Sequence, residues 1–274
     1  MDASNGVITL TNASSLDYET DSIYTLKFFV QEGDDNLRDT AEYSIILENE
    51  VEYSFAGLGD ALQLDGSNDY LTTGFDIGKT AYPSLTVSGW FEYHKGSGSD
   101  NYLFSGFGAS ASDRGRGLLV KNSTGQVWID GGFTHNSGYT LTDGEWYFLT
   151  TVFHSAGYKL YVNGELQLDK TDIDFTITGA QNLVLGRKGG QAVNYSEGRF
   201  DEFAVWGDEL TAAQIANLYG KRVDTSSADL LLYYNFDQKD GELTVIDRSS
   251  NNNPATLNNM TGNEWGQARI LSKA

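Results

Sequence analysis

The chain has 274 residues, with 18 Lys and Arg against 38 Asp and Glu, so its net charge is −20. Such acidity repels phosphate backbones, and we exclude nucleic acid as a partner. With 14 Phe, 16 Tyr and 5 Trp the chain is too aromatic to be disordered. The absence of Cys excludes disulfides and thiolate chemistry, and the short apolar runs exclude membrane insertion.

The front of the chain contains three strand-like runs, at residues 7–10, 24–30 and 43–47. Three strands alone would leave open edges and a half-covered face. We therefore expect a partial β segment over residues 1–54 and a main domain over residues 55–274.

Strand patterns dominate the main domain. Residues 85–93 alternate between apolar and polar side chains, with Trp90 on the polar face, and residues 146–153 are apolar on both faces. The pair Asn163-Gly164 between two alternating runs predicts a hairpin with a type I′ turn. Glycines break the chain about every ten residues, which is typical of an all-β sandwich.

One helix is predicted after residue 210. Thr211 can cap it, Gln214 stands three residues further on, and Gly220 suits the position after its last turn. With about ten residues it is an accessory to the sheets.

Residues 6–50 resemble the second half of a bacterial cadherin-like repeat. The resemblance is carried by the stretches at residues 6–10, 16–19 and 24–26. It implies that Glu19 helps to bind calcium between domains, although residues 31–35 replace the family's Asp-x-Asp.

Residues 58–220 resemble the laminin-G-like, or concanavalin-A-like, domain. The matching stretches, in family order, are residues 61–71, 87–91, 143–147, 160–164, 198–206 and 210–215. The resemblance implies an all-β fold, an antiparallel jelly-roll β-sandwich, preceded here by an additional short β segment at the N-terminus.

The tail, residues 229–266, is similar to a segment that often opens such a module. It can complete the same sandwich or begin a second one, and we expect the former because an isolated hairpin is barely stable. Similar domains stand in tandem in large bacterial surface adhesins, including RTX-type adhesins. This resemblance implies an extracellular, cell-surface location and contacts with adjacent domains of the same long chain.

Glycosidases of the concanavalin-like fold carry two carboxylates on one strand face, about 5 Å apart. No strand here has the alternating acids of that signature: Asp172 and Asp174 stand in a turn-like segment, and Asp201 and Glu202 would point to opposite faces of an extended strand. We expect no enzyme.

Calcium prefers carboxylate, amide and carbonyl oxygens. The resemblance suggests that Asp65 and Asp201 clip the first strand to a late one through Ca²⁺, and that Asp130 binds Ca²⁺ at a strand exit. The alternative is that Asp65 only starts a turn and Asp201 only caps a strand.

Ligand-binding residues are expected where oxygen-rich loops meet at one end of the sandwich. Sugars need an aromatic platform and directional polar groups. The candidate residues are Asp100, Asp113, Arg114, Trp128, His135, Asn136, Arg187, Asn194 and Tyr195. The alternative is that these loops are solvated connectors.

The sequence thus predicts a non-catalytic, calcium-dependent module that binds a glycan or peptide on a host or neighbouring cell. Two alternatives remain: a spacer rigidified by calcium, and an accessory carbohydrate-binding domain of a secreted glycoside hydrolase. Long loops expected at residues 95–118 and 186–198 favour binding over spacing.

Overall fold

The structure is a computed structural model that describes residues 23–32, 37–46, 59–106, 115–131, 134–171, 180–238 and 240–267. The chain divides into two compact units, Met1–Glu52 and Tyr53–Ala274. Within the described ranges no helix is long and apolar enough to cross a membrane. The predicted strand at residues 7–10 lies outside these ranges.

The first unit contains an antiparallel pair of strands, β1 (Ile23–Glu32) and β2 (Leu37–Ile46), in which Ile23 pairs with Ile46. The pair corresponds to the two strand-like runs predicted at residues 24–30 and 43–47.

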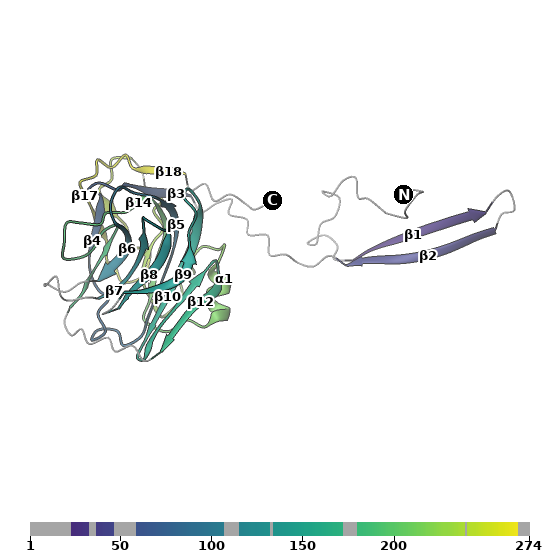
Figure 1. The fold of residues 1–274 in the computed structure, drawn as a ribbon, viewed down its shortest axis with the longest axis horizontal. Coiled ribbons are helices and arrows are strands. Elements are labelled where there is room, and N and C mark those ends of the chain that lie inside the picture. The colour runs from purple at the N-terminus through teal and green to yellow at the C-terminus, as the bar shows by residue number, and fades with distance from the viewer. Residues whose placement is uncertain are drawn as a thin grey trace. The chain divides into compact units, whose positions relative to one another are not determined.

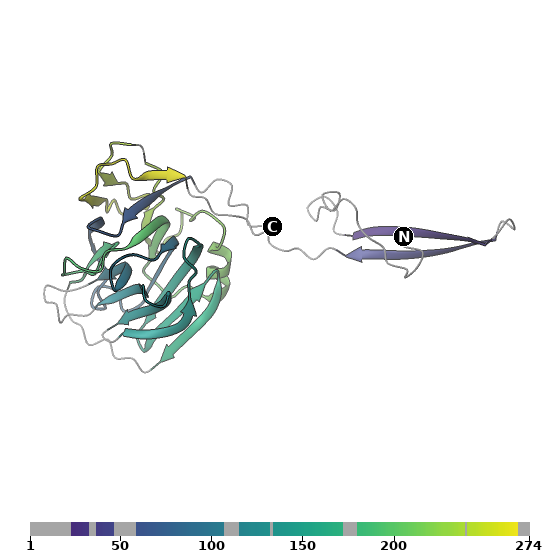
Figure 2. The ribbon, with the colours of Figure 1, turned by 45° about the horizontal axis from the view of Figure 1, so that its top comes forward.

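The second unit is a sandwich of two eight-stranded antiparallel sheets (Figures 1 and 2), which confirms the predicted all-β, concanavalin-A-like fold. We name each sheet after one of its strands. The β5 sheet has the order β12-β11-β10-β5-β14-β3-β18, with β15 also paired to β14, and the β6 sheet has the order β16-β17-β4-β13-β6-β7-β8-β9.

The strands of the β5 sheet are β3 (Asp60–Asp65), β5 (Leu85–His94), β10 (Trp146–His154), β11 (Gly157–Val162), β12 (Glu165–Thr171), β14 (Glu197–Trp206), β15 (Leu230–Tyr234) and β18 (Trp265–Gln267). Those of the β6 sheet are β4 (Tyr70–Asp76), β6 (Asp100–Gly106), β7 (Arg116–Lys121), β8 (Gln126–Gly131), β9 (Thr134–Thr140), β13 (Asn182–Leu185), β16 (Thr244–Val245) and β17 (Ala255–Asn258). Strands β15 to β18 thus add pairs to both sheets, through β14, β4 and β3.

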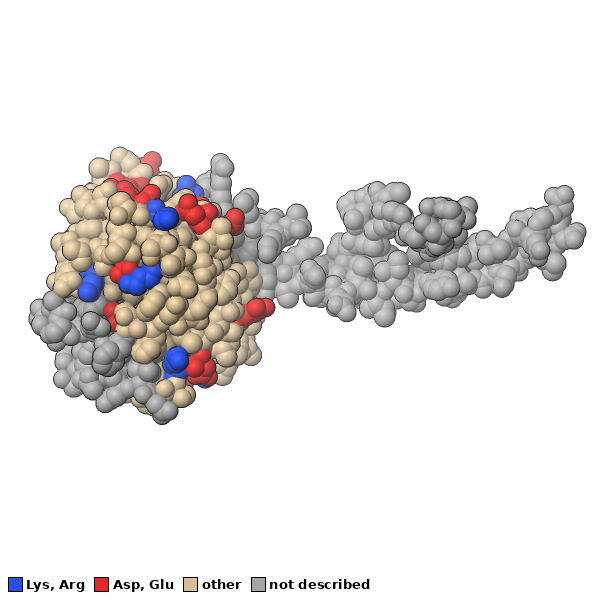
Figure 3. Space-filling view, in the orientation of Figure 1, with Lys and Arg blue, Asp and Glu red and all other residues tan. Residues whose placement is uncertain are grey.

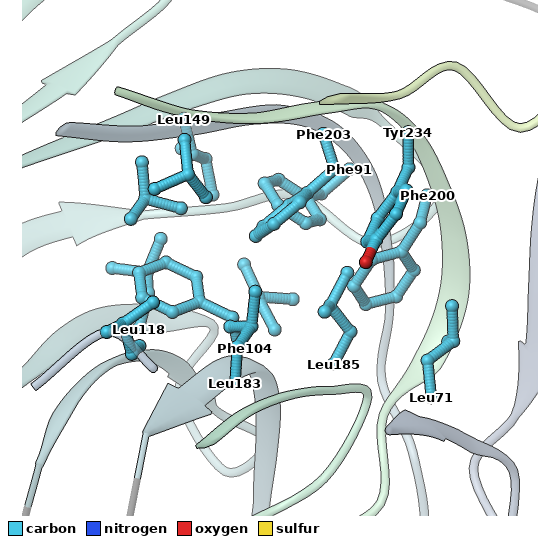
Figure 4. Packing of buried hydrophobic residues seen from close by; sticks show 14 of the residues in the cluster. Leu71, Phe91, Phe104, Leu118, Leu149, Leu183, Leu185, Phe200, Phe203 and Tyr234 are labelled. Atoms are coloured by element: carbon cyan, nitrogen blue, oxygen red, sulfur yellow. The ribbon is translucent and has the colours of Figure 1, made fainter. Parts of the chain in front are cut away.

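The core lies between the sheets, where aromatic and branched side chains from both inner faces interdigitate (Figure 4). Phe104 of the β6 sheet packs against Phe203 of the β5 sheet, with ring centroids 6.1 Å apart. The predicted alternation in β5 is confirmed, since Leu85 and Phe91 lie in this core while Trp90 points away from it.

Helix α1 (Ala212–Leu218) begins at the predicted capping box, in which the side chains of Thr211 and Gln214 satisfy each other's backbone N–H groups. Trp90, which is 1% exposed, stacks on Tyr219 at the end of this helix with ring centroids 5.4 Å apart. The outward side of β5 is therefore covered, and Trp90 is a packing residue.

The predicted hairpin joins β11 to β12. Asn163 and Gly164 both have positive φ angles, 51° and 81°, as the turn requires.

Candidate functional site

The outward face of the β6 sheet brings several predicted site residues together, and strand register explains how. Asp100 pairs with Lys121 between β6 and β7, while Trp128 of β8 pairs with Asn136 of β9. Neighbouring residues such as Ile129 lie in the core. Because side chains alternate along a strand, the four paired residues face outward.

Lys121 is the centre of this group. Its Nζ atom forms an ion pair with Asp100 Oδ1 at 2.8 Å and lies 5.5 Å from the centroid of the Trp128 ring. The side chain of Lys121 remains 33% exposed, so the ammonium is fixed in place but open to solvent. We call Asp100, Lys121 and Trp128 the charged triad.

An open hollow of about 470 Å³ adjoins the charged triad, lined by residues 95–100 and 121–123. Its lining consists of Lys, Ser, Gly, Asp and Asn residues. The buried Asn122 holds its shape by donating from Nδ2 to the Gly98 carbonyl at 2.8 Å. Figure 3 shows that acidic and basic side chains lie beside one another on the face of the molecule it displays, with wide areas of other residues between them.

Residues 187–196 join the hollow to a second cluster. Asn194 Oδ1 accepts a hydrogen bond from Ser99 Oγ at the hollow, at 3.0 Å. Arg187 stacks on Tyr70, with its Cζ atom 3.8 Å from the ring centroid, and the ring of Tyr195 lies 6.2 Å from that of Tyr70. The predicted residues Arg187, Asn194 and Tyr195 are thus near one another.

The prediction of a long loop at residues 95–118 is wrong, because these residues include β6 and the start of β7. His135 and Asn136 likewise lie in β9 and not in a loop. Asn136 faces outward, where it donates to Gln126 Oε1 at 3.1 Å. His135 pairs with the core residue Ile129, and its ring lies 5.7 Å from the buried Tyr158, so it points away from this face.

Three predicted site residues, Glu19, Asp113 and Arg114, lie outside the described residues. The reasoning from sequence missed Lys121 and Tyr70. Tyr70 was inside a stretch that carried the family resemblance, whereas Lys121 had no local signal.

Asp130, another predicted calcium ligand, is 2% exposed and accepts a hydrogen bond from the Tyr102 hydroxyl at 3.3 Å. Asp65 and Asp201, expected to share one ion, are not brought together. Asp65 pairs with Glu197 whereas Leu62 pairs with Phe200, so Asp201 lies toward the other end of β3 from Asp65. Asp65 Oδ1 instead accepts the backbone N–H of Ser67 at 2.8 Å, as its turn-starting alternative predicts.

Asp201 lies in a buried acidic pair with Glu202, which is 1% exposed and has φ +49°. The strand is irregular here, so the expected alternation between these two residues fails. Asp201 Oδ1 accepts from the Glu202 N–H at 2.8 Å, and Glu202 Oε2 accepts from the Tyr233 hydroxyl. Burial raises the pKa of Asp201 well above its usual range and that of Glu202 to about 7.

The other two oxygens of this pair, Asp201 Oδ2 and Glu202 Oε1, are buried and have no hydrogen-bond partner among the residues that the structure describes. The raised pKa values favour the protonated forms of both carboxyl groups, and a bound cation would favour their ionised forms instead. Their two unbonded oxygens are of the kind that calcium prefers as ligands. No three His, Asp or Glu side chains in the described part of the chain converge on one point, so carbonyl, amide and water oxygens would supply the remaining ligands.

Comparison with known proteins identifies the family to which this fold belongs. A family model of concanavalin A-like lectins and glucanases matches residues 65–216, more than half of the chain. The chain belongs to the concanavalin A-like lectin/glucanases superfamily. The superfamily includes both binding proteins and enzymes, so membership establishes the fold and leaves the choice between them to the site.

Among solved structures of similar fold is a protein from Bacteroides ovatus that is proposed to bind carbohydrate. The match covers 90% of this chain and 69% of the Bacteroides chain, with a TM-score of 0.60 and 17% sequence identity. A SAP-like pentraxin from Limulus polyphemus matches 62% of this chain and 84% of its own, with TM-score 0.45 and 16% identity. The human adhesion G-protein coupled receptor D1 is 30% identical over 120 residues, which is 41% of this chain and only 14% of the receptor.

Proposed function

We propose that this domain is a non-catalytic carbohydrate-binding module of a bacterial cell-surface adhesin, acting outside the cell. The observation that supports it most directly is the charged triad beside the open hollow. Sugar C–H faces stack on aromatic rings, while sugar hydroxyls need directional donors and acceptors. Trp128 offers the ring, and the Ser and Lys groups of the hollow offer the hydrogen bonds.

The burial of the acidic pair supports a binding role over catalysis. Asp201 and Glu202 are 0% and 1% exposed, so a sugar polymer cannot reach them. Retaining glycosidases need two accessible carboxylates that flank the scissile bond. On the outward face of the β6 sheet, the Asp100 carboxylate is held by Lys121 and the Asp130 carboxylate by Tyr102.

We also propose that Ca²⁺ binds at Asp201 and Glu202. These residues belong to β14 in the β5 sheet, whereas the charged triad belongs to the β6 sheet. The ion would therefore act on ligand binding through the stability of the sandwich, and not by touching the sugar. Its charge would compensate the two carboxylate oxygens that lack hydrogen bonds.

A glycan array probed with the whole chain, with and without EDTA, tests the function. We expect one family of glycans to bind, and Trp128→Ala to weaken that binding about fivefold, because stacking on an aromatic ring contributes about 1 kcal/mol. Leu166→Ala, on an exposed side chain of the β5 sheet, is the control and should bind like the wild type. The proposal fails if the folded protein binds no glycan, or if Trp128→Ala binds as well as the control.

A further inference from the structure

The cluster of Arg187, Tyr70 and Tyr195 presents a second aromatic surface that the hollow does not include. Tyr70 faces outward because the next residue of β4, Leu71, lies in the core. All three side chains are half-buried, and Arg187 forms no ion pair with any residue that the structure describes. A guanidinium stacked on a tyrosine offers both a flat surface and directional donors.

Two consecutive residues connect this second cluster to the hollow. Asn194 contacts Ser99 at the rim of the hollow, and Tyr195 lies against Tyr70. Asn194 has φ +58°, a left-handed conformation that asparagine tolerates well and that bends the chain at this point. Asn194 and Tyr195 therefore link the second cluster to the rim of the hollow.

The strand order gives the length of this surface. Tyr70 lies in β4 and Trp128 in β8, and the sheet order between them is β4-β13-β6-β7-β8. Four steps of about 4.8 Å between neighbouring strands place the two rings about 19 Å apart. That separation exceeds the length of one or two sugar rings.

We propose that the two clusters form one extended site for a linear oligosaccharide that lies across the strands, with Arg187, Tyr70 and Tyr195 as its second subsite. The inference rests on the proposed glycan-binding function and deepens it by naming the ligand class. A single sugar or a disaccharide occupies the hollow and the charged triad. A longer chain passes Asn194 and stacks its far end on the second subsite.

A chain-length series tests this site. The probes are mono- to hexasaccharides of the linkage that gives the strongest signal on the glycan array, titrated calorimetrically against the whole chain. We expect the affinity of the wild type to rise at least tenfold between the disaccharide and the longest probes. Tyr195→Ala should abolish most of that rise and leave the affinity for the disaccharide within about twofold, because a tenfold rise corresponds to about 1.4 kcal/mol, the size of one stacking contact.

Arg187→Ala should give the same pattern as Tyr195→Ala through a different element of the subsite, while Trp128→Ala should weaken every probe. The inference is overturned if affinity does not grow beyond the disaccharide, or if both subsite variants keep the full rise. A folded protein that binds no glycan would instead overturn the proposed function itself, so the two failures are distinguishable.

Discussion

Replacing Asp201 by Asn tests the calcium site without changing the shape of the side chain. The amide keeps the oxygen that accepts the Glu202 N–H, but it removes the negative charge whose second oxygen has no hydrogen-bond partner within the described ranges. The variant should therefore fold, and in EDTA it should be about as stable as the wild type, because burial already favours the neutral form of Asp201 when no calcium is bound.

The expected size of the calcium effect follows from binding linkage. At a calcium concentration about 50 times a dissociation constant near 10⁻⁴ M, binding stabilises the folded state by about 2 kcal/mol. For a domain of roughly 200 residues this raises the melting temperature by roughly 4–8 °C. Asp201→Asn should lose most of this increase.

Differential scanning calorimetry in EDTA and in excess Ca²⁺ measures the effect directly. Asp169→Asn is the matched control, since that carboxylate is 44% exposed in β12 and should leave the increase unchanged. The reasoning is refuted if the wild type melts at the same temperature in both conditions, or if Asp201→Asn retains the full calcium-dependent increase.

Three further predictions concern stability. Burial beside Asp65 raises the pKa of Asp69 to about 6. The folded state therefore keeps a proton that the unfolded chain loses near pH 4. The free energy of unfolding should fall as the pH rises from about 4 to about 6. Urea unfolding across this range should show a shallower fall for Asp69→Asn than for the wild type, and equal slopes would contradict the burial argument. Phe104→Ala, at a side chain 1% exposed, should cost about 3–5 kcal/mol in urea unfolding, and a loss below 1 kcal/mol would mean that the two sheets do not share this core. Thr211→Ala should cost about 1 kcal/mol through loss of the capping box, and Thr211→Ser should restore most of it if the cap is responsible.

Local chemistry explains which elements the sequence predicted well. The turn at Asn163-Gly164 needs two positive φ angles, which those residue types adopt at low cost. The capping box of Thr211 and Gln214 involves only residues three positions apart. Both signals are independent of distant parts of the chain.

Strand β6 shows where local reasoning fails. Asp100 and Asn101 follow a run of Gly and Ser, so they were expected in a loop. In the fold both are buried, because Asn101 donates to the His94 carbonyl at 2.6 Å and Asp100 pairs with Lys121. These partners are supplied by the antiparallel register, which the spacing of residues in the sequence does not specify.

The charged triad and the acidic pair both depend on strand order and register, and for that reason local sequence signals did not predict them. Lys121 meets Asp100 and Trp128 only because β6, β7 and β8 are adjacent in the sheet. Asp201 and Glu202 were expected on opposite faces of a regular strand, but the register shift after Asp201 keeps both side chains buried. Register shifts of this kind depend on the packing of neighbouring strands.

The central claim is that the outward face of the β6 sheet binds carbohydrate, and an NMR footprint tests it most directly. The ligand is the glycan with the strongest array signal, titrated into the isotope-labelled protein. We predict that the indole resonance of Trp128 and the backbone resonance of Lys121 shift together, while Leu166 on the β5 sheet does not respond. Shifts that gather on the β5 sheet and leave Trp128 and Lys121 unchanged would contradict it.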